Sequence, residues 1–277
     1  RNAIAMELFK TQDGTVLNYQ TIGEGDAIVM IHTALENYTV FHEIAPVFAE
    51  SYQVVLIDLR GHGYSDRPHN ISFKDYASDI KELLDHLYID RCALLGHEMG
   101  ASIAVEFAAT YPDIVDAMTL VNPTTLEDMS TSEKLYRKYA YKIRNWAIDD
   151  QLKFLNKMLY YSKRKAKKFL KHVEETNTIA TRAELLAVRN SFNNNHITTY
   201  LDKVVAPTLI IVGEHGERTT VLEAKELNDY MTHAETKFDV FNESGLYPFA
   251  EEKDHFNKVV SDFFRETYQT AEKASQH

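Results

Sequence analysis

Short apolar runs that alternate with helical patterns are the feature that most restricts the fold of this 277-residue chain. Each run is continuously apolar and bounded by turn signals, which is typical of strands buried on both faces of a parallel sheet. Parallel strands joined through helices predict a doubly wound α/β fold. We expect the main strands at 27–31, 54–58, 92–95, 118–121 and 208–212, helices at 75–87, 101–109, 220–231 and 255–267, and an N-terminal hairpin of 6–9 and 16–20.

Residues 126–200 interrupt this alternation. The segment has no glycine, no proline and no clear strand, and it predicts consecutive helices. It carries 15 Lys and Arg against 8 Asp and Glu, whereas the rest of the chain carries 15 against 33. An insertion between strands of an open α/β sheet would lie over their carboxyl ends, where ligands bind. We therefore expect a core made of residues 1–125 and 201–277, and a helical cap, or lid, made of residues 126–200.

Charge and cysteine content restrict the partners and the compartment. A net charge of −11 argues against nucleic acid as a general partner. No apolar run reaches the roughly 18 residues that span a bilayer, and no signal peptide is expected. The single Cys92 excludes an intrachain disulfide and fits a reducing compartment, so we expect a cytoplasmic location. The chain has no Cys/His cluster and no phosphate-cradling glycine loop, so neither a metal nor a cofactor is expected.

A turn between a predicted strand and a predicted helix carries the most specific motif. Residues 96–100 read GHEMG, which keeps both glycines of G-x-S-x-G but has Glu98 at the serine position. Further landmarks follow in order along the chain: 32–34 (HTA), 55–68 (VLIDLRGHGYSDRP), 111–112 (YP), 207–214 (PTLIIVGE) and 244–248 (SGLYP). Together they resemble the α/β-hydrolase superfamily, in the branch with a helical cap, from about residue 7 to residue 266. The resemblance implies a mostly parallel sheet of about eight strands.

The resemblance also implies a catalytic triad of Ser, Asp or Glu, and His in chain order, and all three positions differ here. Glu98 replaces the serine, Gly216 stands at the acid position after His215, and Leu246 stands where the family has histidine. The family's oxyanion hole would be formed by the amides of Thr33 and Met99. With no histidine to activate a nucleophile or a water molecule, two-step hydrolysis by such a triad is not expected.

Glu98 is therefore the candidate catalytic residue. Burial beneath the cap raises the pKa of a carboxyl group, the helix N-terminus lowers it, and the sequence leaves the balance open. A raised pKa would suit a general acid or base in a lyase-, isomerase- or cyclase-like reaction. Alternatively, the Glu98 carboxylate accepts hydrogen bonds from the oxyanion-hole amides and leaves the site inactive.

Other residues are expected near the same pocket. For the histidines, a structural or solvent-facing role is the simpler interpretation, although His215 could reach toward Glu98. Tyr247 could place its hydroxyl in the pocket or pack in the core, and residues 36–38 could line the entrance or begin a helix. The full set of pocket candidates is His32, Ala34, His97, His215, Leu246 and Tyr247.

Three functions thus remain open. The first is an enzyme that acts on a small, largely apolar molecule through Glu98. The second is an inactive pseudo-enzyme that binds or senses such a molecule, and the third is a hydrolase rebuilt around another group such as His97 or His215. The basic run 162–168, SKRKAKK, is either a solvated helix face or an attraction for an anionic ligand, an anionic membrane or an acidic partner.

Overall fold

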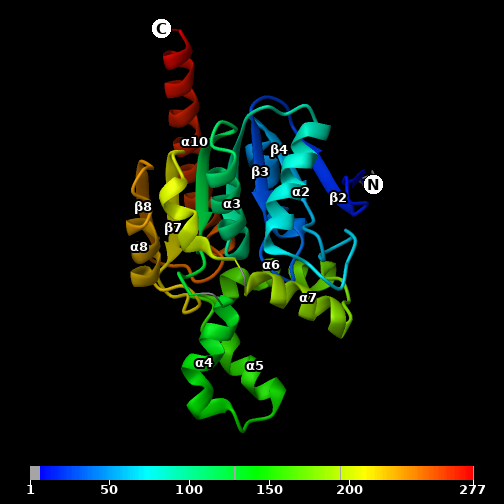
Figure 1. Ribbon diagram of the computed structural model, residues 1–277. Helices are drawn as coiled ribbons and strands as arrows, with labels where there is room; N and C mark the ends of the chain where they lie inside the picture. The colour runs from blue at the N-terminus through cyan, green and yellow to red at the C-terminus, as the bar shows by residue number, and fades with distance from the viewer. Residues whose placement is uncertain (1–6, 128, 194, 277) are drawn as a thin grey trace.

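An eight-stranded sheet forms the centre of the molecule in a computed structural model that describes residues 7–127, 129–193 and 195–276 (Figure 1). The strand order is β1-β2-β4-β3-β5-β6-β7-β8. Strand β2 pairs antiparallel with both β1 and β4, and every other pair of neighbouring strands is parallel. The predicted fold class is thereby confirmed, while Met6 of the predicted hairpin lies outside the described residues. The strands are β1 Glu7–Lys10, β2 Val16–Ile22, β3 Ala27–Ile31, β4 Gln53–Ile57, β5 Cys92–His97, β6 Val115–Val121, β7 Thr208–Gly213 and β8 Thr236–Phe241.

Both faces of the sheet are covered, which explains why its central strands are apolar throughout. Successive side chains of a strand point to opposite faces. In β3, Val29 and Ile31 join one hydrophobic cluster, and Ile28 and Met30 join the other. The first cluster lies beneath α2 (Phe73–His86), α3 (Met99–Thr110) and α8 (Val221–Asp229), and the second beneath α1 (Ala45–Phe48), α9 (Pro248–Glu251) and α10 (Lys253–Ser275).

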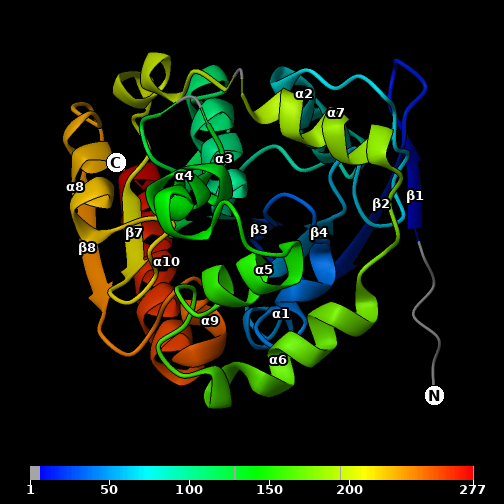
Figure 2. The ribbon, with the colours of Figure 1, turned by 90° about the horizontal axis from the view of Figure 1, so that it is seen from below.

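Four helices between β6 and β7 form what we call the helical insert: α4 (Thr131–Ile143), α5 (Ile148–Asn156), α6 (Lys163–Thr176) and α7 (Arg182–Phe192). In Figure 1, α4 and α5 form a hairpin that projects away from the sheet, while α6 and α7 lie along the underside of the core. Figure 2 shows all four helices from that side. Phe169 of α6 packs into one core cluster and Phe192 of α7 into the other, so the insert closes both layers at this end.

Local sequence signals define where several helices begin. Ser72 and Asp75 form a capping box at the start of α2, and Thr220 and Glu223 form another at the start of α8. Each box pairs two backbone N–H groups that the helix itself leaves free. No helix in the described ranges is both long and apolar enough to cross a bilayer.

Candidate functional site

A sharp turn after β5 positions Glu98. The residue has φ 48° and ψ −111°, a conformation that non-glycine residues rarely adopt, and α3 begins immediately after it. The flanking glycines permit this geometry, because a Cβ at Gly96 would lie 2.3 Å from the Gly100 carbonyl oxygen. A Cβ at Gly100 would lie 2.2 Å from the Ile31 oxygen of β3. The turn therefore requires small residues at both positions and directs residue 98 toward the carboxyl ends of the strands.

Three side chains hold the Glu98 carboxylate. Arg218 Nη1 donates to Oε1 at 3.1 Å and forms an ion pair with it. Thr131 Oγ1, from the first turn of α4, donates to Oε2 at 2.6 Å, and Thr33 Oγ1 donates to Oε1 at 3.3 Å. Only 2% of the Glu98 surface is exposed. The carboxylate is thus bound by the core, by the insert and by the loop after β7.

This environment determines the ionisation of Glu98. Burial alone raises its pKa, but Arg218 and then His97 and the two threonine hydroxyls outweigh burial and lower the pKa below its ordinary value. Glu98 is therefore an ionised acceptor at neutral pH. A general acid or base works best when its pKa lies near the operating pH. The geometry thus disfavours the proton-transfer role expected for Glu98 and favours the alternative of a satisfied, inactive carboxylate.

The predicted oxyanion-hole residues belong to the same network. The Met99 amide donates to Thr33 Oγ1 at 3.3 Å, and this hydroxyl in turn donates to Glu98. The amide is therefore bonded to a side chain of the protein, not directly to the Glu98 carboxylate as the inactive-site alternative assumed. Ala34, on the same loop, is half-buried.

His32 holds the loop after β3. Its Nδ1 lies 2.7 Å from the Thr33 carbonyl oxygen, and its Nε2 accepts from the Leu59 amide at 3.0 Å, so Nδ1 carries the proton. The ring is fully buried, and burial lowers its pKa to about 4. His32 is thus a neutral structural residue.

The other two histidines also have structural partners. His97 is buried, and its Nε2 lies 2.7 Å from the Leu246 carbonyl oxygen. His215 lies at the surface, where Nε2 is 2.8 Å from the Asn242 carbonyl oxygen and the ring packs on Tyr161. The structure places neither ring in a hydrogen bond with Glu98, so the geometry gives no support to a hydrolase rebuilt around them.

Tyr247 and Glu36 form a second polar pair close to Glu98. The Tyr247 hydroxyl donates to Glu36 Oε1 at 2.8 Å, while Glu36 Oε2 is buried and has no hydrogen-bond partner among the described residues. Burial, reinforced by the Glu98 charge and opposed by Tyr247 and Arg218, raises the pKa of Glu36 to about 7. Glu36, which the sequence suggested only as an entrance residue, is thus the carboxyl group here with a pKa near neutrality.

Glu36 also lines a cleft of about 180 Å³ between core and insert. Arg67 crosses the cleft, with hydrogen bonds to the carbonyls of Gly63 and Ile179. The cleft is lined by the loop after β3, the turn after β4 and the α6–α7 segment: Leu35, Glu36, Gly61, His62, Gly63, Arg67, Asn177, Thr178, Ala180, Glu184, Leu185 and Val188. No group of three His, Cys, Asp or Glu side chains in the part of the chain described is arranged to hold a metal ion.

The segment between α5 and α6 is bonded into the loops of the core. Leu246 N donates to the Leu159 carbonyl at 2.7 Å, and Glu217 N donates to the Met158 carbonyl at 3.1 Å. Gly245 lies so close that a Cβ there would be 2.0 Å from the Leu159 oxygen. We call residues 158–162 the anchor segment. It fills the space beside Leu246, whose own surface is 1% exposed.

Arg218 and Thr131 are the site residues that sequence reasoning missed. Arg218 lies 120 positions from Glu98, in the loop after β7. One signal could have identified it: a carboxylate expected to be buried requires a cation, and Arg218 is the only Lys or Arg between residues 204 and 224. Nothing in the sequence around Thr131 distinguishes it from an ordinary helix-starting residue.

Comparison with known proteins places this chain in a family. The family described as "alpha/beta hydrolase fold" matches residues 26–245. The chain is 26% identical to "AB hydrolase superfamily protein YisY" of Bacillus subtilis, over 92% of this chain and 97% of that protein. It is 35% identical to an uncharacterised protein of Mycobacterium bovis over 115 residues. The matched segment is 41% of this chain and 34% of that relative, so the chain spans about a third of the relative's length.

Solved structures agree in fold. An esterase from Exiguobacterium antarcticum superposes with a TM-score of 0.80 at 20% identity, covering 93% of this chain and 98% of the esterase. A structure described as "Est816 as an N-Acyl homoserine lactone degrading enzyme" superposes with a TM-score of 0.78 at 26% identity, covering 92% and 99%. The chain thus shares its arrangement of strands and helices with these two structures.

Proposed function

Because the chain belongs to the alpha/beta hydrolase fold family, we propose that it binds a small, largely apolar molecule between core and insert, and that it does not hydrolyse this molecule through a Ser-His-Asp triad. In this proposal Glu98, Gly216 and Leu246 occupy the three triad positions of the family. Glu98 has no hydroxyl for a base to activate, Gly216 has no carboxylate to orient a histidine, and Leu246 cannot accept a proton.

One observation carries the proposal: the Glu98 carboxylate has three protein partners, and the Met99 amide beside it has one. An oxyanion hole stabilises a reaction only if its donors face the position where charge develops. A donor already bonded to Thr33 must first break that bond. The arrangement favours a protein that keeps the family's pocket and has lost its triad chemistry.

Residues 126–200 act as the cap in this proposal. The cleft beside Glu36 is lined by both core and insert, as expected for a ligand site covered by a lid. The ligand would contact Leu35 and Val188 with its apolar part. Its polar part would meet Glu36 or Arg67.

A second candidate function rests on Glu36. Its Oε2 atom is buried without a partner and its pKa of about 7 suits proton transfer at neutral pH. An enzyme of this kind would use Glu36, with Tyr247 as its hydrogen-bonding partner, in place of the Glu98 proton carrier expected from the sequence. Proton transfer next to a carbonyl group is a reaction class that needs no nucleophile.

A turnover screen separates these functions. The unmodified protein, E98Q and E36Q are each incubated with esters, thioesters, lactones and carbonyl compounds prone to enolisation, and products are followed by mass spectrometry. The panel includes lactones and esters because relatives carry these activities in their descriptions. We expect no turnover, together with compounds that raise the melting temperature of the unmodified protein and E98Q alike. Turnover lost in E36Q alone would establish the second candidate, and turnover lost in E98Q would refute the proposal.

Rebuilding the triad provides a positive control. The triple variant E98S/G216D/L246H restores the family's residue types at all three positions. Hydrolysis of simple esters by this variant would show that only the triad is missing. Failure of a folded triple variant would locate further loss in the amides around Thr33, because that hydroxyl accepts the Met99 N–H.

A further inference from the structure

The hairpin of α4 and α5 exposes apolar side chains that nothing in the described part of the chain covers. None of the residues of α5 is buried. Ile148 is 74% exposed and Leu152, one turn further on the same face, is 53% exposed. Tyr141, near the end of α4, is 79% exposed. An amphipathic helix normally buries its apolar side chains against the rest of the protein. We therefore expect this exposed apolar face to contact another molecule.

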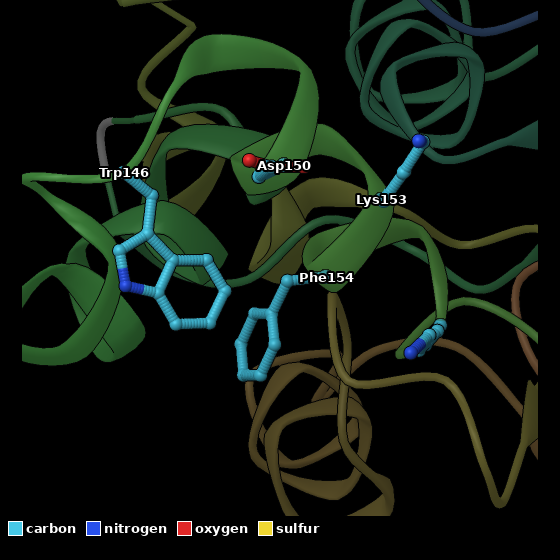
Figure 3. A pocket seen from close by; sticks show the side chains of 5 residues that line it. Trp146, Asp150, Lys153 and Phe154 are labelled. Carbon is cyan, nitrogen blue, oxygen red and sulfur yellow. The ribbon is translucent and has the colours of Figure 1, made fainter.

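An aromatic hollow of about 580 Å³ lies on the other side of α5, where Asp150, Phe154 and Lys157 follow one another at helical spacing (Figure 3). The rings of Trp146 and Phe154 pack edge to face, with centroids 5.6 Å apart. Lys142 Nζ lies 5.0 Å from the centre of the Phe154 ring, and Lys153 and Lys157 stand at the rim with Asp150. An apolar surface with lysines around it suits a boundary between an apolar phase and a layer of negative charge.

The charges of the hairpin divide into two groups. Near its base, Lys134 pairs with Glu223 and Lys138 with Glu217, both in the core. Four other basic side chains form no ion pair with any described residue: Lys142 and Arg144 near the tip, Lys153 within α5 and Lys157 at its C-terminal end. The core thus accounts for the first two cations and leaves these four available.

Helix α6 adds more cations on the same side of the molecule (Figure 2). Its exposed Lys163, Arg164, Lys167 and Lys168 also lack ion pairs within the described ranges. Residues 126–200 together have a balance of +7, against −18 for the rest of the chain. Near a negatively charged surface, this asymmetry turns the insert toward the surface and the core away from it.

We propose that the α4–α5 hairpin docks on an anionic lipid bilayer, with Trp146, Ile148 and Leu152 entering the headgroup region. Lysines of α5 and α6 would contact the anionic lipid headgroups. Asp149 and Asp150 lie in the first turn of α5, where negative charge stabilises the helix N-terminus, and the four unpaired cations of the hairpin outnumber them. Contact between the hairpins of two copies is disfavoured, since it would bring these cations together.

Trp146 gives a direct signal for this docking, because it is the only tryptophan of the chain. The full-length protein is titrated with vesicles of 70% phosphatidylcholine and 30% phosphatidylserine, and with vesicles of phosphatidylcholine alone. We expect a blue shift of tryptophan emission and co-sedimentation with the anionic vesicles only. Quenching by lipids brominated near the headgroup should follow. Raising NaCl from 0.1 to 0.5 M should weaken binding at least tenfold, because salt screens surface charge.

Matched variants separate apolar contacts from charge. I148S/L152S removes the apolar face, and L222S, at an exposed leucine of α8, is its control. K153Q/K157Q removes two of the unpaired cations of the hairpin, and K203Q/K225Q is its control on the core side. Each basic residue near an anionic surface contributes about a fivefold change in binding. We therefore expect K153Q/K157Q to bind roughly 25-fold more weakly and both controls to bind as the unmodified protein does.

The remaining outcomes would overturn the proposal. No shift and no co-sedimentation with anionic vesicles would exclude the bilayer. Equal binding to both vesicle types would remove the role of the cations. A blue shift that grows with protein concentration without lipid would identify a second copy as the occupant, and one produced by poly-glutamate but not by vesicles would identify an acidic protein. None of these results depends on whether the cleft beside Glu36 binds or converts a ligand.

Discussion

Substitution of Arg218 by methionine should destabilise the protein strongly at pH 8. The guanidinium lies 3.1 Å from a carboxylate that is 2% exposed, and at an effective dielectric constant near 20 this attraction is roughly 5 kcal/mol before desolvation. R218M leaves the charge of Glu98 buried without a cation, while the hydroxyls of Thr131 and Thr33 remain. Breaking a buried ion pair from one side costs about 3–5 kcal/mol, and we expect about 3 kcal/mol here.

The destabilisation caused by R218M should depend on pH. In the unmodified protein Arg218 holds the pKa of Glu98 below its ordinary value, so this carboxylate adds stability above that value and loses it as pH falls. In R218M burial is unopposed by the cation, the folded-state pKa rises, and folding favours the protonated form. The penalty of R218M should therefore be largest at pH 8 and should shrink toward pH 5.

Urea unfolding at pH 5 and pH 8 measures these differences. Two further variants serve as controls. E98Q should cost less than R218M, because the Arg218 side chain is 25% exposed and can be hydrated after its partner is lost. The double variant E98Q/R218M should recover most of the loss, since no unpaired charge remains. A penalty under 1 kcal/mol at pH 8, a penalty independent of pH, or a double variant no better than R218M would contradict the role of Arg218 as the counterion of Glu98.

Three other predictions concern single residues. Between pH 5 and pH 8 the unmodified protein should lose about 2 kcal/mol more stability than E36Q. The reason is that Glu36, with a pKa raised to about 7, stays protonated in the folded protein at pH 5, where the unfolded chain is already ionised; urea titrations at both pH values test this. G100A should lower the melting temperature by more than 5 °C, because its Cβ meets the Ile31 oxygen. H97A should lose roughly 2 kcal/mol in calorimetry, whereas H215A, at the surface, should change stability by less than about 0.5 kcal/mol.

The sheet was largely predictable, and the exceptions have physical reasons. Strand β3 matches its predicted bounds, because a strand covered on both faces is apolar at every position. Strand β8 was missed: it forms the edge of the sheet, is only partly buried, and includes Lys237 and Asp239. Helix α10 extends eight residues beyond its predicted end at Thr267, where no apolar periodicity marks its continuation.

The site was predictable only where neighbouring residues determine it. The glycines around Glu98 identified the turn after β5, because local backbone geometry requires them. The partners of Glu98 could not be deduced in the same way, since Arg218 and Thr131 come from loops and helices that meet it only through the tertiary fold. The sign of the pKa shift of Glu98 depends on those partners, and it therefore stayed open until their positions were known.

The anchor segment has a consequence for how a ligand could enter and leave. Backbone hydrogen bonds from Glu217 and Leu246 hold residues 158–162 in the middle of the insert, between the α4–α5 hairpin and helices α6 and α7. We expect the α4–α5 hairpin on one side of this fixed point to move separately from α6 and α7 on the other, once the contacts of Thr131, Lys134 and Lys138 with the core are broken. The amides of Glu217 and Leu246 should then exchange slowly with deuterium while the hairpin exchanges fast. Ligand entry and release would then depend on two separate motions of the insert, each with its own rate.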